Sequence, residues 1–228
     1  MRLGLLPAAG TATRMSGLPK FLLPISEIQQ CLLTYHVEIM GPHVDRIIIP
    51  TRSEWVSLLE SFNFGPQVEI LSMETGTMAE TVKRSLADRD YSSCVLGMPD
   101  TYFVGGNPYR DVASQAPADV TLAAFTTGPD QAGKVGSVRV EADGTVSDHA
   151  DKDAEKNFGT HWGVMEFTQQ VESFLDPTAT TGGYLITEAL NRQMTVRGYV
   201  AGYPYFDCGT FSEYLQCLVF VDLPRESA

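Results

Sequence analysis

Two basic residues, Arg14 and Lys20, stand six positions apart in the segment LLPAAGTATRMSGLPKFLLP, residues 5–24. The apolar run at residues 3–6 precedes them and is typical of a buried strand. Small side chains follow that run, so backbone N–H groups can approach a polyphosphate closely; they belong to Ala8, Ala9, Gly10, Thr11, Ala12 and Thr13. Arg14 and Lys20 add fixed positive charge. The segment therefore predicts a loop that binds a polyphosphate.

Two aspartates each follow an apolar, strand-like run. Asp100 lies in LGMPDTYF, residues 96–103, and Asp207 lies in FDCGT, residues 206–210. Mg²⁺ prefers hard oxygen ligands and is usually held by one or two carboxylates together with phosphates of a substrate. The pair is therefore a candidate magnesium site beside the predicted loop. Taken singly, each aspartate would more often be a turn or capping residue, and each basic residue a solvated charge.

The first half of the chain has the pattern of elements needed to position these residues. Apolar, β-branched strands alternate with helical patterns, which predicts a mostly parallel, doubly wound α/β sheet. In such sheets, ligands bind at the carboxyl ends of the strands, where the loop and Asp100 are expected. The predicted strands span residues 3–6, 44–50, 68–71 and 93–97, and the predicted helices span residues 28–40, 53–60 and 77–86.

The second half is richer in strand patterns. A hairpin turn is expected at Asp143-Gly144, because Asp-Gly is a favoured turn dipeptide. Thr168 is expected to cap a helix. The predicted strands span residues 119–125, 134–140, 146–150 and 161–167, and residues 200–206 are expected to form a final strand and loop. Further helices are expected at residues 184–193 and 211–220.

Composition excludes several classes of protein. Asp and Glu outnumber Lys and Arg by 28 to 16, for a formal net charge of −12, whereas proteins that bind nucleic acid display clusters of Lys and Arg. No apolar stretch approaches the ~18 residues that a membrane span needs, and the start of the chain lacks a signal-peptide pattern. We therefore expect a cytoplasmic protein with no nucleic-acid or membrane partner. The four cysteines form no C-x-x-C pair and are predicted to be reduced core thiols.

The opening segment resembles the signature loop of the sugar nucleotidyltransferases, or nucleoside-diphosphate-sugar pyrophosphorylases, usually written G-x-G-T-R-x-x-P-K-x-L-L-P with a variable gap. Ala12 stands at the second glycine of that motif. The contexts of the two aspartates are also similar to the family. The first metal-binding aspartate of the family follows a strand as L-G-D, whereas Asp100 has two additional residues after Gly97; the second lies in a D-x-G-T segment, as Asp207 does.

Weaker similarities follow in the family's order along the chain. Gly76 and Thr77 resemble the G-T-x-x-A segment, whose backbone contacts the base. Gly136 lies in a stretch similar to the Y-G-V-V strand near the sugar, and Lys152 resembles the lysine that meets the sugar phosphate. His161 and Gly163 fall where the family has N-T-G, and residues 182–190 resemble a helix start, G-E-x-x-L-T-D.

The resemblance implies one Rossmann-like domain of the glycosyltransferase-A type over residues 1–228. Its nucleotide-binding half spans about residues 1–115, and its small β-rich half, about residues 116–228, binds the sugar phosphate. The implied reaction is attack of a sugar 1-phosphate on the α-phosphorus of a nucleoside triphosphate, which yields an NDP-sugar and pyrophosphate. A phosphate monoester has a second pKa of about 6, so it needs no general base.

The resemblance also implies a role for each site residue. Arg14 is assigned to the β- and γ-phosphates, Lys20 to the transferring phosphoryl group, and Lys152 to the sugar phosphate. Asp100 and Asp207 are assigned to Mg²⁺, which bridges both reactants. A homodimer like those of the family is compatible with the sequence.

Two other functions remain open from the sequence. One is a cytidylyltransferase for a polyol or methylerythritol phosphate, whose opening P-A-A-G-x-x-x-R-M-x-x-x-x-P-K fits residues 7–20 with one residue fewer between Met15 and Pro19. The other is a non-catalytic relative that binds a nucleotide or a sugar phosphate as a regulatory subunit. The D-x-G-T segment at Asp207 favours the sugar enzymes over the first alternative, and retention of both lysines and both aspartates argues against the second.

Overall fold

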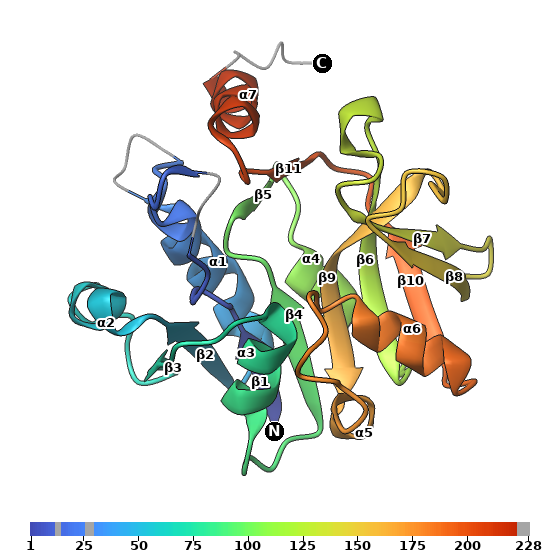
Figure 1. The fold of residues 1–228 in the computed structure, drawn as a ribbon, viewed down its shortest axis with the longest axis horizontal. Helices are drawn as coiled ribbons and strands as arrows, with labels where there is room; N and C mark the ends of the chain where they lie inside the picture. The colour runs from blue at the N-terminus through green and yellow to red at the C-terminus, as the bar shows by residue number, and fades with distance from the viewer. Residues whose placement is uncertain (12–14, 26–29, 223–228) are drawn as a thin grey trace.

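A computed structural model of the chain describes residues 1–11, 15–25 and 30–222. Within this part of the chain, nine strands form one sheet, whose central path runs β10-β6-β9-β4-β1-β2-β3 (Figure 1). The strands of the first half are β1 (Arg2–Leu5), β2 (Arg46–Thr51), β3 (Val68–Ser72) and β4 (Ser93–Gly97). All pairings among these four are parallel. The predicted parallel arrangement is confirmed here.

Helices cover both faces of this parallel region because successive strand residues point to opposite sides. Ile47 and Ile49 belong to one apolar cluster, together with side chains of α1 (Leu32–Met40) and α4 (Pro108–Ala113). Ile48 belongs to the other cluster, together with side chains of α3 (Met78–Leu86) and α6 (Tyr184–Asn191). The remaining helices of this half are α2 (Ser53–Glu60) and the short η2 (Lys20–Leu22) and η3 (Gly41–His43).

The second half enters the same sheet through a long central strand, β9 (Thr160–Thr168), which runs antiparallel between β4 and β6 (Val120–Thr126). β10 (Val196–Val200) continues the sheet parallel to β6. A hairpin of β7 (Gly136–Val140) and β8 (Val146–Asp151) turns at Asp143-Gly144, where Gly144 has φ +83°. The predicted hairpin is therefore confirmed. Thr168 does occupy the N-cap position of α5 (Gln169–Glu172), but its side chain makes no capping hydrogen bond. A single 3-10 turn, η4 (Pro129–Gln131), precedes the hairpin.

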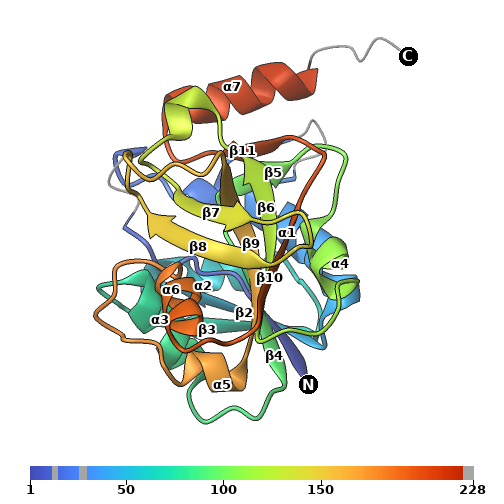
Figure 2. The ribbon, with the colours of Figure 1, turned by 90° about the vertical axis from the view of Figure 1, so that its right-hand side faces the viewer.

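The segment predicted as a final strand and loop, residues 200–206, divides between two strands. β10 ends at Val200, and β11 (Tyr205–Asp207) pairs with β5 (Thr101–Phe103) in a separate small sheet. The last helix, α7 (Phe211–Asp222), lies across this small sheet at the end of the molecule away from the N-terminus (Figures 1 and 2). The predicted helix at residues 28–40 begins at Leu32; its predicted residues 28 and 29 lie outside the described residues.

Burial agrees with the predicted state of the cysteines. Cys31, Cys94, Cys208 and Cys217 are all buried and free. Within residues 1–11, 15–25 and 30–222, no helix combines the length and the apolar character that crossing a membrane requires.

Candidate active site

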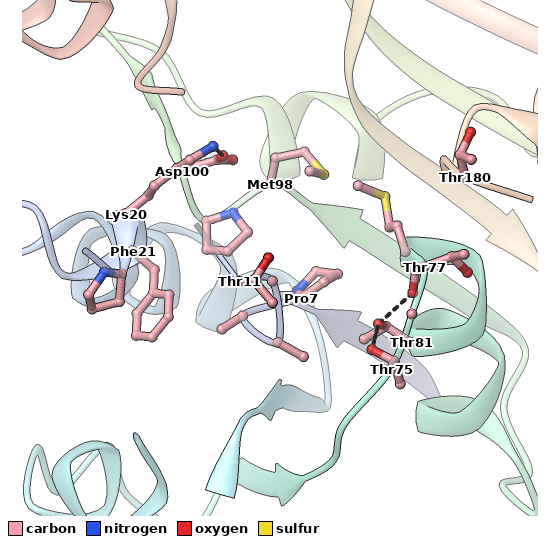
Figure 3. Close-up of a pocket in the computed structure, with 17 residues that line it drawn as sticks. Pro7, Thr11, Lys20, Phe21, Thr75, Thr77, Thr81, Met98, Asp100 and Thr180 are labelled. Atoms are coloured by element: carbon pink, nitrogen blue, oxygen red, sulfur yellow. Dashed lines mark hydrogen bonds and ion pairs between the residues drawn. The ribbon is translucent and has the colours of Figure 1, made fainter. Parts of the chain in front are cut away.

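A cavity of about 370 Å³ opens at the carboxyl ends of β1 and β4, beside the start of α3 (Figure 3). Three segments line most of it: the turn after β1, the turn before α3 and the turn after β4. The lining residues are Pro7, Ala8, Ala9, Gly10, Thr11, Pro19, Lys20, Phe21, Thr75, Gly76, Thr77, Met78, Thr81, Met98, Pro99, Asp100 and Thr180. The cavity thus brings together most of the residues predicted to bind the nucleotide and one of the predicted metal ligands.

The turn after β1 presents backbone to the cavity. Ala8 still pairs with β2, because its N–H donates to the carbonyl of Pro50 at 2.8 Å and its carbonyl accepts from Thr51 Oγ1 at 3.3 Å. A Cβ atom added to Gly10 would meet no atom within 4 Å, so this residue faces open space. Ala12, Thr13 and Arg14 lie outside the described residues, and their roles stay predictions.

Lys20 and Asp100 form an ion pair on the wall of the cavity. Lys20 Nζ lies 3.2 Å from Asp100 Oδ2, and the two side chains are 12% and 23% exposed. Lys20 opens the short helix η2, where Pro19 precedes it with φ −67° and the buried Phe21 anchors the turn. The ion pair leaves both charged groups at the edge of a space large enough for a phosphate group.

The two additional residues before Asp100 form a tight turn. Thr101 N donates to the carbonyl of Met98 at 3.1 Å, which closes a β-turn with Pro99 at its second position. Thr101 Oγ1 donates to the same carbonyl at 2.8 Å. The two additional residues therefore form part of this β-turn, and the Asp100 carboxylate remains close enough to Lys20 for an ion pair.

The buried side chain of His36 stabilises this turn. His36 Nε2 lies 2.8 Å from the carbonyl of Thr101, and its Nδ1 lies 2.6 Å from Tyr109 Oη. Because a carbonyl can only accept, Nε2 carries the hydrogen and Nδ1 accepts from the Tyr109 hydroxyl. Burial lowers the pKa of His36 to about 4, so the ring is neutral. Glycine at position 97 is required as well, since a Cβ there would lie 2.1 Å from Tyr109 Oη.

Asp207 is brought to Asp100 by the small sheet. It lies opposite Thr101 in the β5–β11 pairing, and Cys208 N donates to the carbonyl of Asp100 at 2.8 Å. The carboxylates of both aspartates help raise the pKa of Tyr205 above its ordinary value, after the larger effect of burial, so both act on the same ring. The two predicted metal ligands, 107 positions apart, thus become neighbours.

The residues after Asp207 explain the D-x-G-T pattern physically. A Cβ on Gly209 would lie 2.9 Å from Asp207 Oδ1, so glycine leaves room for that carboxylate. Thr210 Oγ1 accepts from Glu213 N at 3.3 Å and donates to Glu213 Oε2 at 2.8 Å, which caps the start of α7.

The donor set suits Mg²⁺. No group of three or more His, Cys, Asp or Glu side chains that could hold a metal occurs in the described part of the chain. Mg²⁺ does not need such a cage, because it takes one or two carboxylates and completes its shell with water and substrate phosphates. Asp100, which lines the cavity, and Asp207, which the β5–β11 pairing brings beside it, match that requirement.

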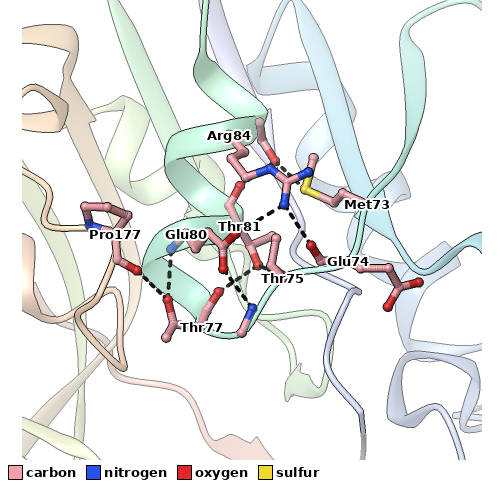
Figure 4. A network of polar contacts seen from close by, with 10 residues as sticks. Met73, Glu74, Thr75, Thr77, Glu80, Thr81, Arg84 and Pro177 are labelled. Carbon is pink, nitrogen blue, oxygen red and sulfur yellow. Dashed lines mark hydrogen bonds and ion pairs between the residues drawn. The ribbon is translucent and has the colours of Figure 1, made fainter.

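The opposite wall is the capped start of α3 (Figure 4). Thr77 is the N-cap: its Oγ1 accepts from Glu80 N at 3.0 Å and donates to the carbonyl of Pro177 at 2.8 Å. Glu80 Oε2 in turn accepts from Gly76 N at 2.8 Å. Arg84 contacts both the Glu80 carboxylate and the carbonyl of Glu74. Gly76 and Thr77 therefore take part in capping α3 and also line the cavity.

The four residues predicted to bind the sugar phosphate do not line the cavity. His161 has no exposed surface: its ring packs against Phe125 and Tyr205, Nδ1 lies 3.2 Å from Thr127 Oγ1, and burial lowers its pKa to about 4. A ligand contact by His161 is not favoured for this reason.

Packing also explains the two glycines of this group. A Cβ on Gly163 would lie 2.6 Å from the ring of Phe125, and one on Gly136 would lie 2.3 Å from Trp162 Nε1. The indole of Trp162 therefore covers Gly136. Lys152 alone is exposed, at the end of β8 with φ +53°, and its role stays a prediction.

No family model and no curated protein sequence matches this chain. Solved structures do match it over almost their whole length. A Bacillus anthracis protein assigned as a glucose-1-phosphate thymidylyltransferase, crystallised with sucrose, has a TM-score of 0.82 at 15% identity, and the match covers 100% of this chain and 98% of that one. A UDP-glucose pyrophosphorylase bound to UDP-glucose has a TM-score of 0.81 at 16% identity and coverages of 96% and 98%.

The inositol-1-phosphate CTP transferase of T. maritima is also similar, with a TM-score of 0.76 at 16% identity and coverages of 98% and 97%. These structures confirm the fold that the sequence predicted, a mixed α/β sheet of the nucleotidyltransferase type.

Proposed function

We propose that this chain, which has the fold of the sugar-phosphate nucleotidyltransferases, transfers a nucleotidyl group from a nucleoside triphosphate to a sugar 1-phosphate. The observation that carries the proposal is that the Lys20–Asp100 ion pair lies on the wall of one cavity and that the β5–β11 pairing brings Asp207 beside Asp100. These residues come from three distant parts of the chain.

The chain's contribution to this reaction is positioning and charge. The backbone of residues 7–11 binds the triphosphate, and Lys20 neutralises charge that develops on the transferring phosphoryl group. Asp100 and Asp207 would hold Mg²⁺, which supplies positive charge to oxygens of both reactants when it is bound. Arg14 at the β- and γ-phosphates and Lys152 at the incoming sugar phosphate complete the proposed set.

A second candidate acceptor is a polyol phosphate, with CTP as the donor. One observation favours it: the similarity to an inositol-1-phosphate CTP transferase. Both candidates use the same phosphoryl chemistry and the same three residues. They differ in the acceptor alone.

The test is pyrophosphate release by the purified protein with Mg²⁺ across a matrix of triphosphates against sugar 1-phosphates and polyol phosphates. We expect one pairing to give turnover that depends on added Mg²⁺. Lys20→Met should lower kcat by about a hundredfold, as loss of one electrostatic stabiliser does in other enzymes.

Lys83→Met is the matched control, because Lys83 also has a single partner, the carbonyl of Leu175 at 2.8 Å, but lies outside the cavity lining. It should keep wild-type turnover. Activity restricted to CTP with polyol phosphates would select the second candidate, and no turnover with any pairing would contradict both.

A further inference from the structure

The cavity wall formed by the start of α3 carries three threonine hydroxyls. Thr75, Thr77 and Thr81 all line the cavity. Figure 3 places them on the side away from Lys20 and Asp100, with the turn after β1 between the two sides. A nucleotide that has its phosphates at Lys20 and extends along this turn has its base beside the threonines.

The hydrogen atom of each hydroxyl is used inside the protein. Thr77 Oγ1 donates to the carbonyl of Pro177 at 2.8 Å. Thr81 Oγ1 donates to the carbonyl of Thr77 at 2.9 Å, because a carbonyl oxygen can only accept. Thr75 Oγ1 lies 2.6 Å from Thr81 Oγ1, and since the hydrogen of Thr81 is already used, Thr75 is the donor in this contact. The three hydroxyls can therefore only accept further hydrogen bonds.

Thr75 is the hydroxyl whose acceptor capacity is unused. Thr77 Oγ1 already accepts from Glu80 N at 3.0 Å, and Thr81 Oγ1 accepts from Thr75. Thr81 is also only 4% exposed. Thr75 is half-buried, and among the described residues its oxygen accepts no hydrogen bond. The cavity wall therefore offers one hydroxyl oxygen that is free to accept and unable to donate.

An oxygen that can only accept discriminates between nucleobases. Cytosine and adenine carry an exocyclic amino group, which donates, where uracil, thymine and guanine carry a carbonyl oxygen, which only accepts. A carbonyl facing Thr75 Oγ1 would bring two acceptors together without a hydrogen atom between them. Polar groups that are removed from water and left unpaired are costly. The Thr75 oxygen therefore favours a base with an amino group at this position.

We propose that Thr75 Oγ1 accepts a hydrogen bond from the exocyclic amino group of the base, so that the nucleotide donor is a cytidine or adenosine triphosphate and not a uridine, thymidine or guanosine triphosphate. Thr81 is then a positioning residue, because it takes the hydroxyl hydrogen of Thr75 and so keeps that oxygen an acceptor. This inference rests on the proposed function, since it names the donor class of that reaction.

The kinetic test compares matched pairs of triphosphates, CTP with UTP and ATP with ITP. In each pair the second member has a carbonyl oxygen in place of the amino group. We expect kcat/KM to be about 10- to 100-fold higher for the amino member of the pair that the enzyme uses, as loss of one paired hydrogen bond produces. Equal kcat/KM for both members, or a preference for UTP, dTTP or GTP, would overturn the proposal.

Variants at two positions separate the hydrogen bond from packing. Thr75→Val removes the oxygen at nearly constant volume and should abolish most of the preference, whereas Thr75→Ser keeps the hydroxyl and should retain it. Thr81→Val frees the hydrogen of Thr75 to donate to a carbonyl, so kcat/KM with UTP or ITP should rise. General loosening of the fold would not produce this gain.

Thr178→Val is the matched control, because Thr178 Oγ1 donates to Asp176 Oδ1 and lies outside the cavity lining. It should keep the wild-type preference between the members of each pair. A preference that is unchanged in Thr75→Val, or unchanged in Thr81→Val, would contradict the role given to these hydroxyls.

Binding measured without an acceptor separates this inference from the proposed function. Titration calorimetry of the full chain with each triphosphate and Mg²⁺ reports the base preference whether or not transfer occurs. Tighter binding of the amino member that Thr75→Val abolishes, without turnover on any acceptor, supports the base assignment and contradicts the proposed reaction. Turnover that is equally efficient with a carbonyl base supports the reaction and overturns the base assignment. Binding of no triphosphate overturns both.

Discussion

At the scale of single residues, we expect the Lys20–Asp100 pair to contribute little to folding. A partly exposed ion pair is usually worth about 0–1 kcal/mol, and these side chains are 12% and 23% exposed. Asp100 is joined to the rest of the site through its backbone as well, since its carbonyl accepts from Cys208 N. The fold therefore keeps the position of this residue when its charge is removed.

We expect Asp100→Asn to lower kcat by about a hundredfold or more and to weaken the dependence of turnover on Mg²⁺, because the carboxylate charge is lost while the side-chain shape is kept. Unfolding in urea should change by less than about 1 kcal/mol. Asp143→Asn is a suitable control, since Asp143 accepts from Thr145 N in an exposed hairpin turn. Wild-type turnover in Asp100→Asn would remove this residue from the site.

At the scale of elements, the β-turn at residues 98–101 is the link between the core and the site. This turn connects β4 to β5 and contains Asp100. The buried side chain of His36, which is hydrogen-bonded to Tyr109, stabilises it through a hydrogen bond to the carbonyl of Thr101. Both side chains are fully buried. Their hydrogen bonds therefore determine the position of a carboxylate that neither of them touches.

Tyr109→Phe should leave His36 Nδ1 without its donor and loosen the turn. We expect a destabilisation of about 1–3 kcal/mol, the cost of leaving a buried polar group unpaired. We also expect a weaker apparent affinity for Mg²⁺, measured as the metal concentration at half-maximal turnover. Tyr35→Phe is the matched control, because Tyr35 Oη donates to Phe103 farther along β5. An equal change in metal affinity in both variants would show that the effect comes from general destabilisation of the fold and not from the loss of the His36–Tyr109 hydrogen bond.

The elements also show why prediction from the sequence succeeded in part. The strands of the parallel half are continuous apolar runs such as residues 47–49, and buried parallel strands have this pattern. The three-residue strands β5 and β11 and the six-residue α4 are too short to carry a period, so the sequence does not predict them. The predicted meeting of Asp100 and Asp207 rested on the resemblance to a family, whereas its physical cause, the pairing of β5 with β11, is visible in the structure alone.

Side-chain packing across the fold could not be predicted either. Gly136, His161 and Gly163 were assigned to the sugar phosphate from their order along the chain, but each is covered or buried by an aromatic ring from another position. Trp162 follows His161 directly, yet nothing in that dipeptide indicates that the indole lies against Gly136. Contacts of this kind depend on strand register, here of β7 and β9, where Ser137 lies opposite His161.

At the scale of the whole molecule, two buried neutral histidines link folding to pH. Burial lowers the pKa of both His36 and His161 from 6.5 to about 4. The unfolded chain therefore takes up protons between pH 6.5 and 4 that the folded chain does not, so stability falls as pH falls through this window. Each histidine contributes up to about 1.4 kcal/mol per pH unit there.

We expect the urea midpoint to fall steadily from pH 7 to pH 5, before most carboxylates titrate. His161→Phe, which places a ring among the aromatic neighbours of His161, should make the decrease shallower, because this side chain then no longer takes up a proton on unfolding. A slope identical to that of the wild type would contradict the assignment.

The pairing of β5 with β11 has a consequence for synthesis of the chain on the ribosome. Asp207, at the end of β11, is translated 107 positions after Asp100. The β5–β11 pairing, and with it the proposed affinity for a metal ion, can therefore form only after translation has passed residue 207.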